Sequence, residues 1–476
     1  MTPGVDVWRI ELAERMSVIV DAADYFRALR EGMLLARHRI MLIGWDFDAR
    51  VALDRERREP GEPETVGQLI PWLVDRTPGL EVYLLRWDLG AVKALFRGTT
   101  LFNLFGWALR RRLHARLDGH HPTGASHHQK IVVIDDCLAF CGGIDVTGER
   151  WDTRLHRDEE PGRRWPGRRA YKPWHDATSA VSGSVAATLG ELARDRWRLA
   201  GGGALAPVRR LDPCWPGCLT ADFENVEVGV ARTVPPMPDD PAVHESEALF
   251  LGEIARVERW MYVESQYFAS RRIAEAVARR LDEPDGPEFV IVNPRHAQGW
   301  LEPIAMDTAR ERLMEALKGR DPRGRLRMYH PVTAGGRDIY VHAKILVADD
   351  RVLRLGSSNM NNRSLRLDTE CDLAIEAADE GDRRRIAAVR DGLLAEHLGV
   401  PAAAVAARLA ATGSLIETVE GLRAGGKTLM PYEPEGLDAV RCWLADNEVL
   451  DPEGPEAMFE PLSRRGLFRR LRKPRG

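Results

Sequence analysis

Histidine and lysine recur in this chain at one short spacing, each time followed by an apolar run. The two copies read HQKIVVIDDCLAFCGGID (128–145) and HAKILVADDRVLRLGSSN (342–359), and they align without a gap. Side chains two positions apart in an extended chain share a face, so His128 and Lys130 point the same way. The same holds for His342 and Lys344. Two such segments brought together would surround one point with two imidazoles and two ammonium groups.

These residue types suit the cleavage of a phosphodiester. One imidazole can attack phosphorus while the other protonates the leaving oxygen. Ammonium and amide groups can hold the charged non-bridging oxygens, so this chemistry needs no metal. Each copy also carries a second pair of residues two positions apart on its next strand, Gly143/Asp145 and Ser357/Asn359. The predicted phosphate-binding set is therefore Lys130, Lys344, Asp145, Ser357 and Asn359.

The alternative interpretation is that these are ordinary core histidines beside incidental lysines. The composition argues against it, because only seven of the 68 Lys and Arg residues are lysine. Lysine nevertheless stands at the same place in both copies. One chance match to H-x-K-x4-D-x6-G has odds on the order of one in a thousand, and two matches far less. We therefore prefer the functional interpretation.

Both copies resemble the signature of the phospholipase D superfamily, H-x-K-x4-D-x6-G-[SG]-x-[ND], which occurs twice in its members. The resemblance implies that His128 is the nucleophile, forming a phosphohistidine, and that His342 is the general acid. The residues alone leave these two roles open. In that family a carboxylate further along the chain orients each histidine. By this spacing Glu370 would serve His342 and Asp176 would serve His128, with an exposed insertion at 150–172 lengthening the second interval.

The aspartates of the signature, Asp135 and Asp349, are counted with its catalytic residues. Their odd offset from the histidine–lysine face predicts a structural role instead, in which they bond neighbouring backbone or lysine. Asp145 stands where the second copy has Asn359, a departure that resembles the lipid-cleaving, eukaryotic-type members. A carboxylate there would repel phosphate unless a lysine pairs with it.

Each copy also follows a helix-like stretch and two apolar strands. The strands read IMLIGWDF (40–47) and EVYLLRW (81–87) in the first copy, and MYVESQYF (261–268) and EFVIVNP (288–294) in the second. This pattern and the resemblance predict an α/β protein of two tandem phospholipase D-like lobes, each a mixed β-sheet flanked by helices, with the active site at the lobe interface. The predicted divisions are an N-terminal lobe (1–205), a linker (206–225), a C-terminal lobe (226–400) and a helical extension with a basic tail (401–476).

The composition narrows the class of protein further. A net charge of −4 and a pI of about 6.4 argue against a dedicated nucleic-acid binder. No secretory signal and no spanning apolar run are visible, so we expect a cytoplasmic monomer. Six cysteines do not suggest a disulfide scaffold. The CxxxC pairs Cys137/Cys141 and Cys214/Cys218 leave a four-thiolate zinc site as an alternative, whereas we expect neither metal nor cofactor at the active site.

Two segments bear on the substrate. Residues 94–117 combine aromatic side chains with arginines, which fits either an interfacial segment that enters lipid or a core-packed helix with a solvated basic end. Residues 463–476 carry seven Arg or Lys, which favours peripheral contact with an anionic membrane. We therefore expect a phospholipase D that cleaves glycerophospholipids or transfers their phosphatidyl group. The alternatives are a cardiolipin synthase-like transferase, a nuclease of the same superfamily and an inactive lipid-binding module.

Overall fold

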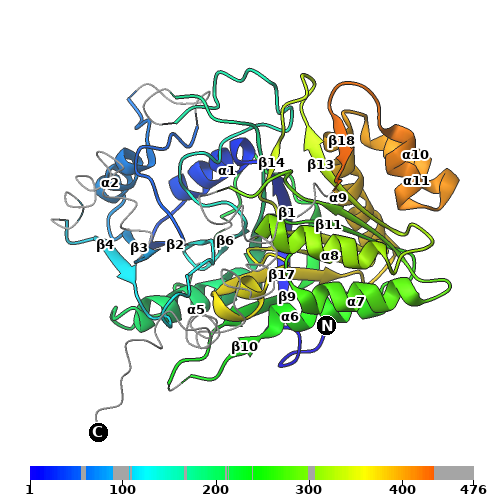
Figure 1. Ribbon diagram of the computed structural model, residues 1–476. Helices are drawn as coiled ribbons and strands as arrows, with labels where there is room; N and C mark the ends of the chain where they lie inside the picture. The colour runs from blue at the N-terminus through cyan, green and yellow to red at the C-terminus, as the bar shows by residue number, and fades with distance from the viewer. Residues whose placement is uncertain are drawn as a thin grey trace, which may run out of the picture.

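The structure is a computed structural model that carries one large sheet with helices on both sides (Figure 1). It describes residues 1–54, 61–88, 107, 110–165, 169–209, 212, 214–238, 240–298 and 306–433.

The first half of the chain supplies one end of this sheet, in the order β4-β3-β2-β5-β6-β8-β1. Its strands are β1 (Arg9–Val20), β2 (Arg39–Gly44), β3 (Glu81–Trp87), β4 (Leu113–Asp118), β5 (Ile131–Ile134), β6 (Leu138–Gly142) and β8 (Ala177–Gly183). The second half supplies the other end, in the order β18-β13-β12-β11-β15-β16-β17-β9. Its strands are β9 (Phe223–Val234), β11 (Trp260–Glu264), β12 (Glu288–Val292), β13 (Leu326–Val332), β15 (Ile345–Ala348), β16 (Val352–Gly356), β17 (Glu370–Glu376) and β18 (Thr428–Pro431).

The two halves meet at β1 and β9, which pair antiparallel from Arg9↔Val230 to Met16↔Phe223. Counted outward from this seam, the strands follow the same order in both halves, β1-β8-β6-β5-β2-β3-β4 and β9-β17-β16-β15-β11-β12-β13. The sequence repeat therefore folds as two equivalent lobes. The predicted α/β architecture of two lobes is confirmed. The sequence did not indicate that the two sheets would join into one. A short parallel pair, β7 (Trp174–His175) with β14 (Tyr340–Val341), links the lobes a second time.

Helices bury both faces of the sheet. They are α1 (Ala22–Leu34), α2 (Val66–Arg76), α5 (Ser184–Leu199), α6 (Glu245–Arg256), α7 (Arg271–Asp282), α8 (Thr308–Lys318), α9 (Glu380–Leu398), α10 (Ala402–Thr412) and α11 (Leu415–Leu422). Strand β3 shows how the faces are divided. Val82 and Leu84 join the core that contains α1 and α2, whereas Tyr83 and Leu85 join the core that contains α5. This alternation is why the strand is apolar throughout.

The predicted divisions need two corrections. The boundary at residue 226 falls inside β9, and the extension that begins at residue 401 is only partly helical. After α10 and α11 the chain forms β18, which pairs antiparallel with β13 and so belongs to the sheet of the second lobe. The basic tail, 463–476, lies outside the described residues. In the described part of the chain no single helix has the length and apolar character of a membrane span; α9 and α10 meet that test only as a pair bent by 109°.

The aromatic-basic stretch at 94–117 is described only at residue 107 and from residue 110 onward. Trp107 is buried, and its ring centroid lies 5.9 Å from that of Phe47. Residues 113–118 form β4, so the core-packed helix, one of the two alternatives for this stretch, does not extend to this end. The phenylalanines of the stretch lie outside the described residues.

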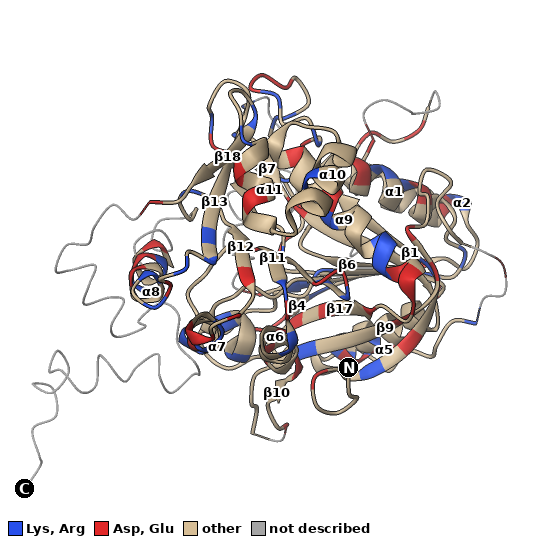
Figure 2. Ribbon diagram, turned by 90° about the vertical axis from the view of Figure 1, so that its right-hand side faces the viewer, with Lys and Arg blue, Asp and Glu red and all other residues tan. Residues whose placement is uncertain are grey.

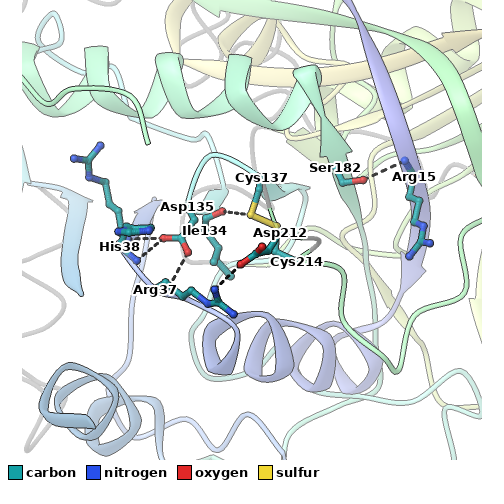
Figure 3. The surroundings of a disulfide bond; sticks show 10 residues. Arg15, Arg37, His38, Ile134, Asp135, Cys137, Ser182, Asp212 and Cys214 are labelled. Carbon is teal, nitrogen blue, oxygen red and sulfur yellow. Dashed lines mark hydrogen bonds and ion pairs between the residues drawn. A yellow bond between two sulfur atoms is a disulfide. The ribbon is translucent and has the colours of Figure 1, made fainter. Parts of the chain in front are cut away.

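A disulfide joins Cys137, in the turn between β5 and β6, to Cys214, in the segment between the lobes (Figure 3). The zinc alternative is therefore wrong, because two of its four thiolates are bonded to each other. The remaining two lie apart: Cys141 is buried, with its Sγ 3.7 Å from the carbonyl oxygen of Cys371, while the backbone N–H of Cys218 donates to Glu31.

Candidate active site

The two histidine–lysine segments lie where the lobes contact each other. His128 and Lys130 directly precede β5, and His342 and Lys344 lie between β14 and β15. The backbone N–H of His128 donates to the carbonyl of Thr369 (2.9 Å), and that of His342 donates to the carbonyl of His175 (2.7 Å). Each histidine is therefore anchored by the backbone of the opposite lobe.

The carboxylates that orient the histidines are exchanged between the lobes. Nδ1 of His128 lies 3.0 Å from both oxygens of Glu370, and Nδ1 of His342 lies 2.7 Å from Oδ2 of Asp176. The assignment by spacing, Glu370 to His342 and Asp176 to His128, is therefore wrong.

Strand pairing between the lobes explains the exchange. Strands β7 and β14 are parallel, with Trp174 opposite Tyr340 and His175 opposite Val341. The next residue of each strand is Asp176 and His342, so these two come side by side. A parallel bridge between His127 and Thr369 brings His128 beside Glu370 in the same way.

The glycine of the first signature makes room for one of these carboxylates. A Cβ at Gly143 would lie 2.2 Å from Oδ1 of Asp176. That oxygen also accepts the backbone N–H of Ala177 at 2.8 Å. The second copy has Ser357 at this place. Its hydroxyl accepts the N–H of Cys371 at 3.0 Å and is fully buried. The structure thus places Ser357 behind the site, contrary to its predicted contact with phosphate.

Both lysines are fixed against the backbone of their own motif. Lys130 Nζ donates to the carbonyl of His128 (2.8 Å) and lies 3.4 Å from Oδ2 of Asp145. This contact supplies the lysine partner that a carboxylate at Asp145 requires. Lys344 Nζ donates to the carbonyl of His342 and lies 3.4 Å from Oε1 of Gln266. Burial lowers the pKa of Lys344 to about 7, and the charge of Lys130 adds to the lowering.

The two histidines have different electrostatic surroundings. Burial, together with Lys130 and Lys344, holds the pKa of His128 well below its usual value. Burial and Lys344 lower that of His342 as well. For Asp176, burial favours a raised pKa, but His342 and Lys344 outweigh it and hold the pKa below its ordinary value.

Glu370 behaves oppositely, because burial raises its pKa well above the ordinary value. Asp176, which stays ionised, stabilises a positive charge on His342 and offsets part of the burial that lowers the pKa of that ring. Because both rings keep lowered pKa values, the roles of acid and nucleophile rest on the family resemblance.

The aspartates of the signature have the structural role that their offset predicts. Asp135 accepts the backbone N–H groups of residues 37, 38 and 39 at 2.6–2.8 Å (Figure 3). Asp349 does the same for residues 258, 259 and 260 at 2.7–3.0 Å. Each clamps the segment that enters β2 or β11, so neither belongs with the catalytic residues.

A cavity of about 490 Å³ opens on both histidines and on Asp145 and Asn359. Sequence reasoning missed much of its lining. The additional lining residues include Trp45, Trp87, Glu149, Arg150, Trp174, Gln266 and Tyr340. Some signal was present, because WDF at 45–47 and ESQYF at 264–268 end two of the predicted strands, although the strand pattern assigns them no chemistry. Gln266 in fact donates to Tyr340 (2.9 Å) and lies 3.4 Å from Nδ2 of Asn359.

The insertion at 150–172 is not simply exposed, as was expected. Its first residue, Arg150, lies over the ring of Trp174 at 4.4 Å and borders the cavity. Asp152, His156 and Arg163 are buried. This segment therefore forms part of the wall behind the site.

Comparison with known proteins agrees with this geometry. The phospholipase D family profile matches residues 32–212 and 312–444, so the chain belongs to the phospholipase D family. Phospholipase D alpha 1 of Vigna unguiculata is 23% identical over 507 residues, which cover 77% of this chain and 62% of that protein. Phospholipase D alpha 1 of Nicotiana tabacum is 23% identical over 517 residues, covering 78% and 63%. The chain thus spans less than two thirds of the length of these relatives.

Among solved structures, phosphatidylserine synthase of Haemophilus influenzae Rd KW20 has the same fold. The two superpose with a TM-score of 0.54 at 12% identity, over 81% of this chain and 87% of that one.

Proposed function

We propose that this protein is a phospholipase D that cleaves the head-group phosphodiester of glycerophospholipids through a phosphohistidine on His128. The observation that carries the proposal is the pair of crossed histidine–carboxylate contacts, His128–Glu370 and His342–Asp176, bordering one cavity with a lysine behind each histidine. This arrangement supplies a nucleophile, an acid and two positive charges for one phosphate.

The reaction proceeds in two steps. Because Nδ1 of each ring faces its carboxylate, Nε2 is the nitrogen available for chemistry. Nε2 of His128 attacks phosphorus, the bond from phosphorus to the head-group oxygen breaks, and His342 gives that oxygen a proton. Water then loses a proton to His342 and attacks phosphorus, which breaks the phosphorus–nitrogen bond and releases phosphatidate.

Transfer to an alcohol follows the same route, with the alcohol in place of water. The similarity to phosphatidylserine synthase supports testing this second activity, which includes cardiolipin synthase-like transfer.

A lipid substrate is favoured over nucleic acid by charge and by the cavity wall. The net charge is −4, and Figure 2 shows both basic and acidic residues on α7 and α8. The rings of Trp45 and Trp87 stack at 5.8 Å along the cavity, where they offer apolar surface. The relatives named phospholipase D support the same substrate class. Intact motifs with both carboxylates count against an inactive lipid-binding module.

The test incubates the pure protein with mixed phospholipids, with and without a primary alcohol, and separately with single-stranded DNA. We expect phosphatidate alone without the alcohol and phosphatidyl-alcohol when the alcohol is present. His128→Ala should abolish both products, while His114→Gln, a half-exposed histidine on β4, should leave them unchanged. Cleavage of DNA without either lipid product would refute the lipid assignment and leave the two-histidine mechanism standing.

The remaining expectations belong to this proposal. We propose a cytoplasmic monomer in peripheral contact with the membrane through the basic tail. Deleting residues 464–476 should then raise KM on anionic liposomes and leave the rate on a short-chain soluble diester unchanged, because each basic side chain near an anionic leaflet contributes about 1 kcal/mol. The Cys137–Cys214 disulfide is more typical of an oxidising compartment, so the proposed cytoplasmic location is tested by alkylating the protein in intact cells. Alkylation of both cysteines supports that location, and protection of both contradicts it.

A further inference from the structure

A cluster of buried ionisable side chains lies directly behind the Asp176–His342 pair, and the proposed reaction does not use it. Its members come from five separate segments of the chain and are all buried. They are Asp21, Asp152, His156, His175, Glu264, Glu396 and His397.

His175 is the centre of this cluster. Its Nε2 lies 2.7 Å from Oε2 of Glu264, and its Nδ1 lies 2.9 Å from Oε1 of Glu396. Oδ1 of Asp21 lies 3.4 Å from the same Nδ1. A neutral imidazole has one N–H and one lone pair, so it can donate to a carboxylate on one side only. Donation to Glu264 and Glu396 together requires the protonated ring.

His156 has the same arrangement beside it. Its Nδ1 lies 3.2 Å from Asp152 and its Nε2 lies 2.9 Å from Oε1 of Glu396. Burial opposes a charge on either ring, but Glu264 and Asp21 outweigh it, and the pKa values of His175 and His156 are both raised.

The contacts around both rings favour their protonated forms. His175 meets Glu264 and Glu396, and His156 meets Asp152 and Glu396. A neutral ring would turn a lone pair toward one of these buried carboxylate oxygens, which is costly. His397 completes the cluster as a neutral ring, because its Nε2 alone contacts a carboxylate, Glu264, at 2.9 Å.

The cluster is connected to the general acid through backbone. The carbonyl of His175 accepts the N–H of His342. Asp21 N–H donates to the carbonyl of Asp176 at 2.8 Å, and Asp176 N–H donates back to Oδ1 of Asp21 at 3.1 Å. Fixing the ring of His175 therefore fixes the strand that carries Asp176 and the backbone that carries His342.

We propose that His175, as an imidazolium held between Glu264 and Glu396, is the positioning residue for the general acid of this enzyme. It is fully buried and does not border the cavity. It sets the distance between Asp176 and His342, and with it the direction in which His342 delivers its proton. The inference rests on the proposed function in one respect, the assignment of His342 as the acid.

The test exploits the leaving group, because an acid matters only when the departing oxygen needs a proton. Two soluble phosphodiesters are compared in first-turnover experiments, one releasing p-nitrophenol and one releasing an alkyl alcohol. We expect His175→Asn to slow alcohol release about 100-fold and p-nitrophenol release by less than about 3-fold. Glu264→Gln, which removes the charge that faces His175, should shift the ratio in the same direction.

The matched control is His397→Asn, an equally buried histidine that also contacts Glu264 but has no backbone bond to His342. It should lower the melting temperature and leave the ratio of the two rates unchanged.

Three results would overturn the inference. The first is an equal slowing of both diesters by His175→Asn and Glu264→Gln, which marks a purely structural role; loss of all activity in both variants counts the same way. The second is a change of ratio in the His397→Asn control. The third is about one equivalent of bound transition metal in the purified wild-type protein that is missing from the His175→Asn variant. Such a metal has a place to bind, because one ligand atom each of Asp21, His156, His175 and Glu396 lie within 4.8 Å of one another. A metal there would occupy the nitrogens assigned to protons. A wild-type protein that cleaves both diesters and no phospholipid refutes the lipid function and leaves this inference intact.

Discussion

Gly143 offers a direct test of how closely the carboxylate of Asp176 must be held. A Cβ at this position would lie 2.2 Å from Oδ1 of Asp176, whereas such atoms normally approach to about 3.3 Å or more. In Gly143→Ala the carboxylate must therefore move by about 1 Å, and a displacement of that size near the reacting groups costs on the order of 100-fold in rate. The move also strains the bonds from Asp176 to Ala177 and to His342.

We expect Gly143→Ala to lower kcat about 100-fold on a phospholipid or an alkyl diester, with KM nearly unchanged. The control is Gly203→Ala, because an added Cβ there meets nothing within 4 Å. Melting temperatures of both variants separate a misplaced carboxylate from general destabilisation. Asp176→Asn supplies a further check: combined with Gly143→Ala it should be no slower than Asp176→Asn alone, since both changes act on one contact. A Gly143→Ala enzyme of normal kcat, or rate losses that multiply in the double variant, would refute the reasoning.

Four further predictions follow from the site. Because each carboxylate orients the histidine of the other lobe, Glu370→Gln should prevent a trappable phosphohistidine, whereas Asp176→Asn should still form one from a p-nitrophenyl diester. Mass spectrometry of the quenched enzyme checks this. The opposite pattern would restore the assignment by spacing. The free enzyme needs a neutral His128 and a protonated His342, and burial lowers the pKa of both rings. It also needs Lys344 as ammonium, with a pKa of about 7. The profile of kcat/KM should therefore be highest in acidic buffer, begin to fall as His342 loses its proton and fall more steeply above about pH 7, and Lys344→Arg should remove the second fall only. Activity should persist in EDTA on a soluble diester, because two histidines and two lysines supply the chemistry; loss in chelator with recovery on adding one divalent ion would contradict it. Reducing the Cys137–Cys214 disulfide, which closes a loop of 77 residues, should lower the free energy of unfolding by about 4 kcal/mol. Unfolding measured with and without reductant checks this. In the Cys137→Ser control, reductant should make no difference.

The sequence by itself determined the chemistry of the site and the repeat that builds it. His128, Lys130, His342 and Lys344 stand at fixed local spacings, and alternation along an extended chain is enough to place each pair on one face. The same local geometry predicted that Asp135 would turn away and bond backbone, as it does in clamping the entry to β2. Two equal copies also imply two equal lobes, because the same apolar pattern folds the same way twice.

Only the tertiary structure decided which carboxylate serves which histidine. The sequence offered distance along the chain as a guide, and that guide paired Glu370 with His342. The pairing of β7 with β14 joins segments from opposite lobes, and it places Asp176 beside His342 instead. His175 was hidden for the same reason: its partners Glu264 and Glu396 lie far along the chain and gather only when the sheet closes. Local spacing fixes which face a side chain takes, whereas contacts between distant segments depend on how strands pair, and that is set by packing of the whole sheet.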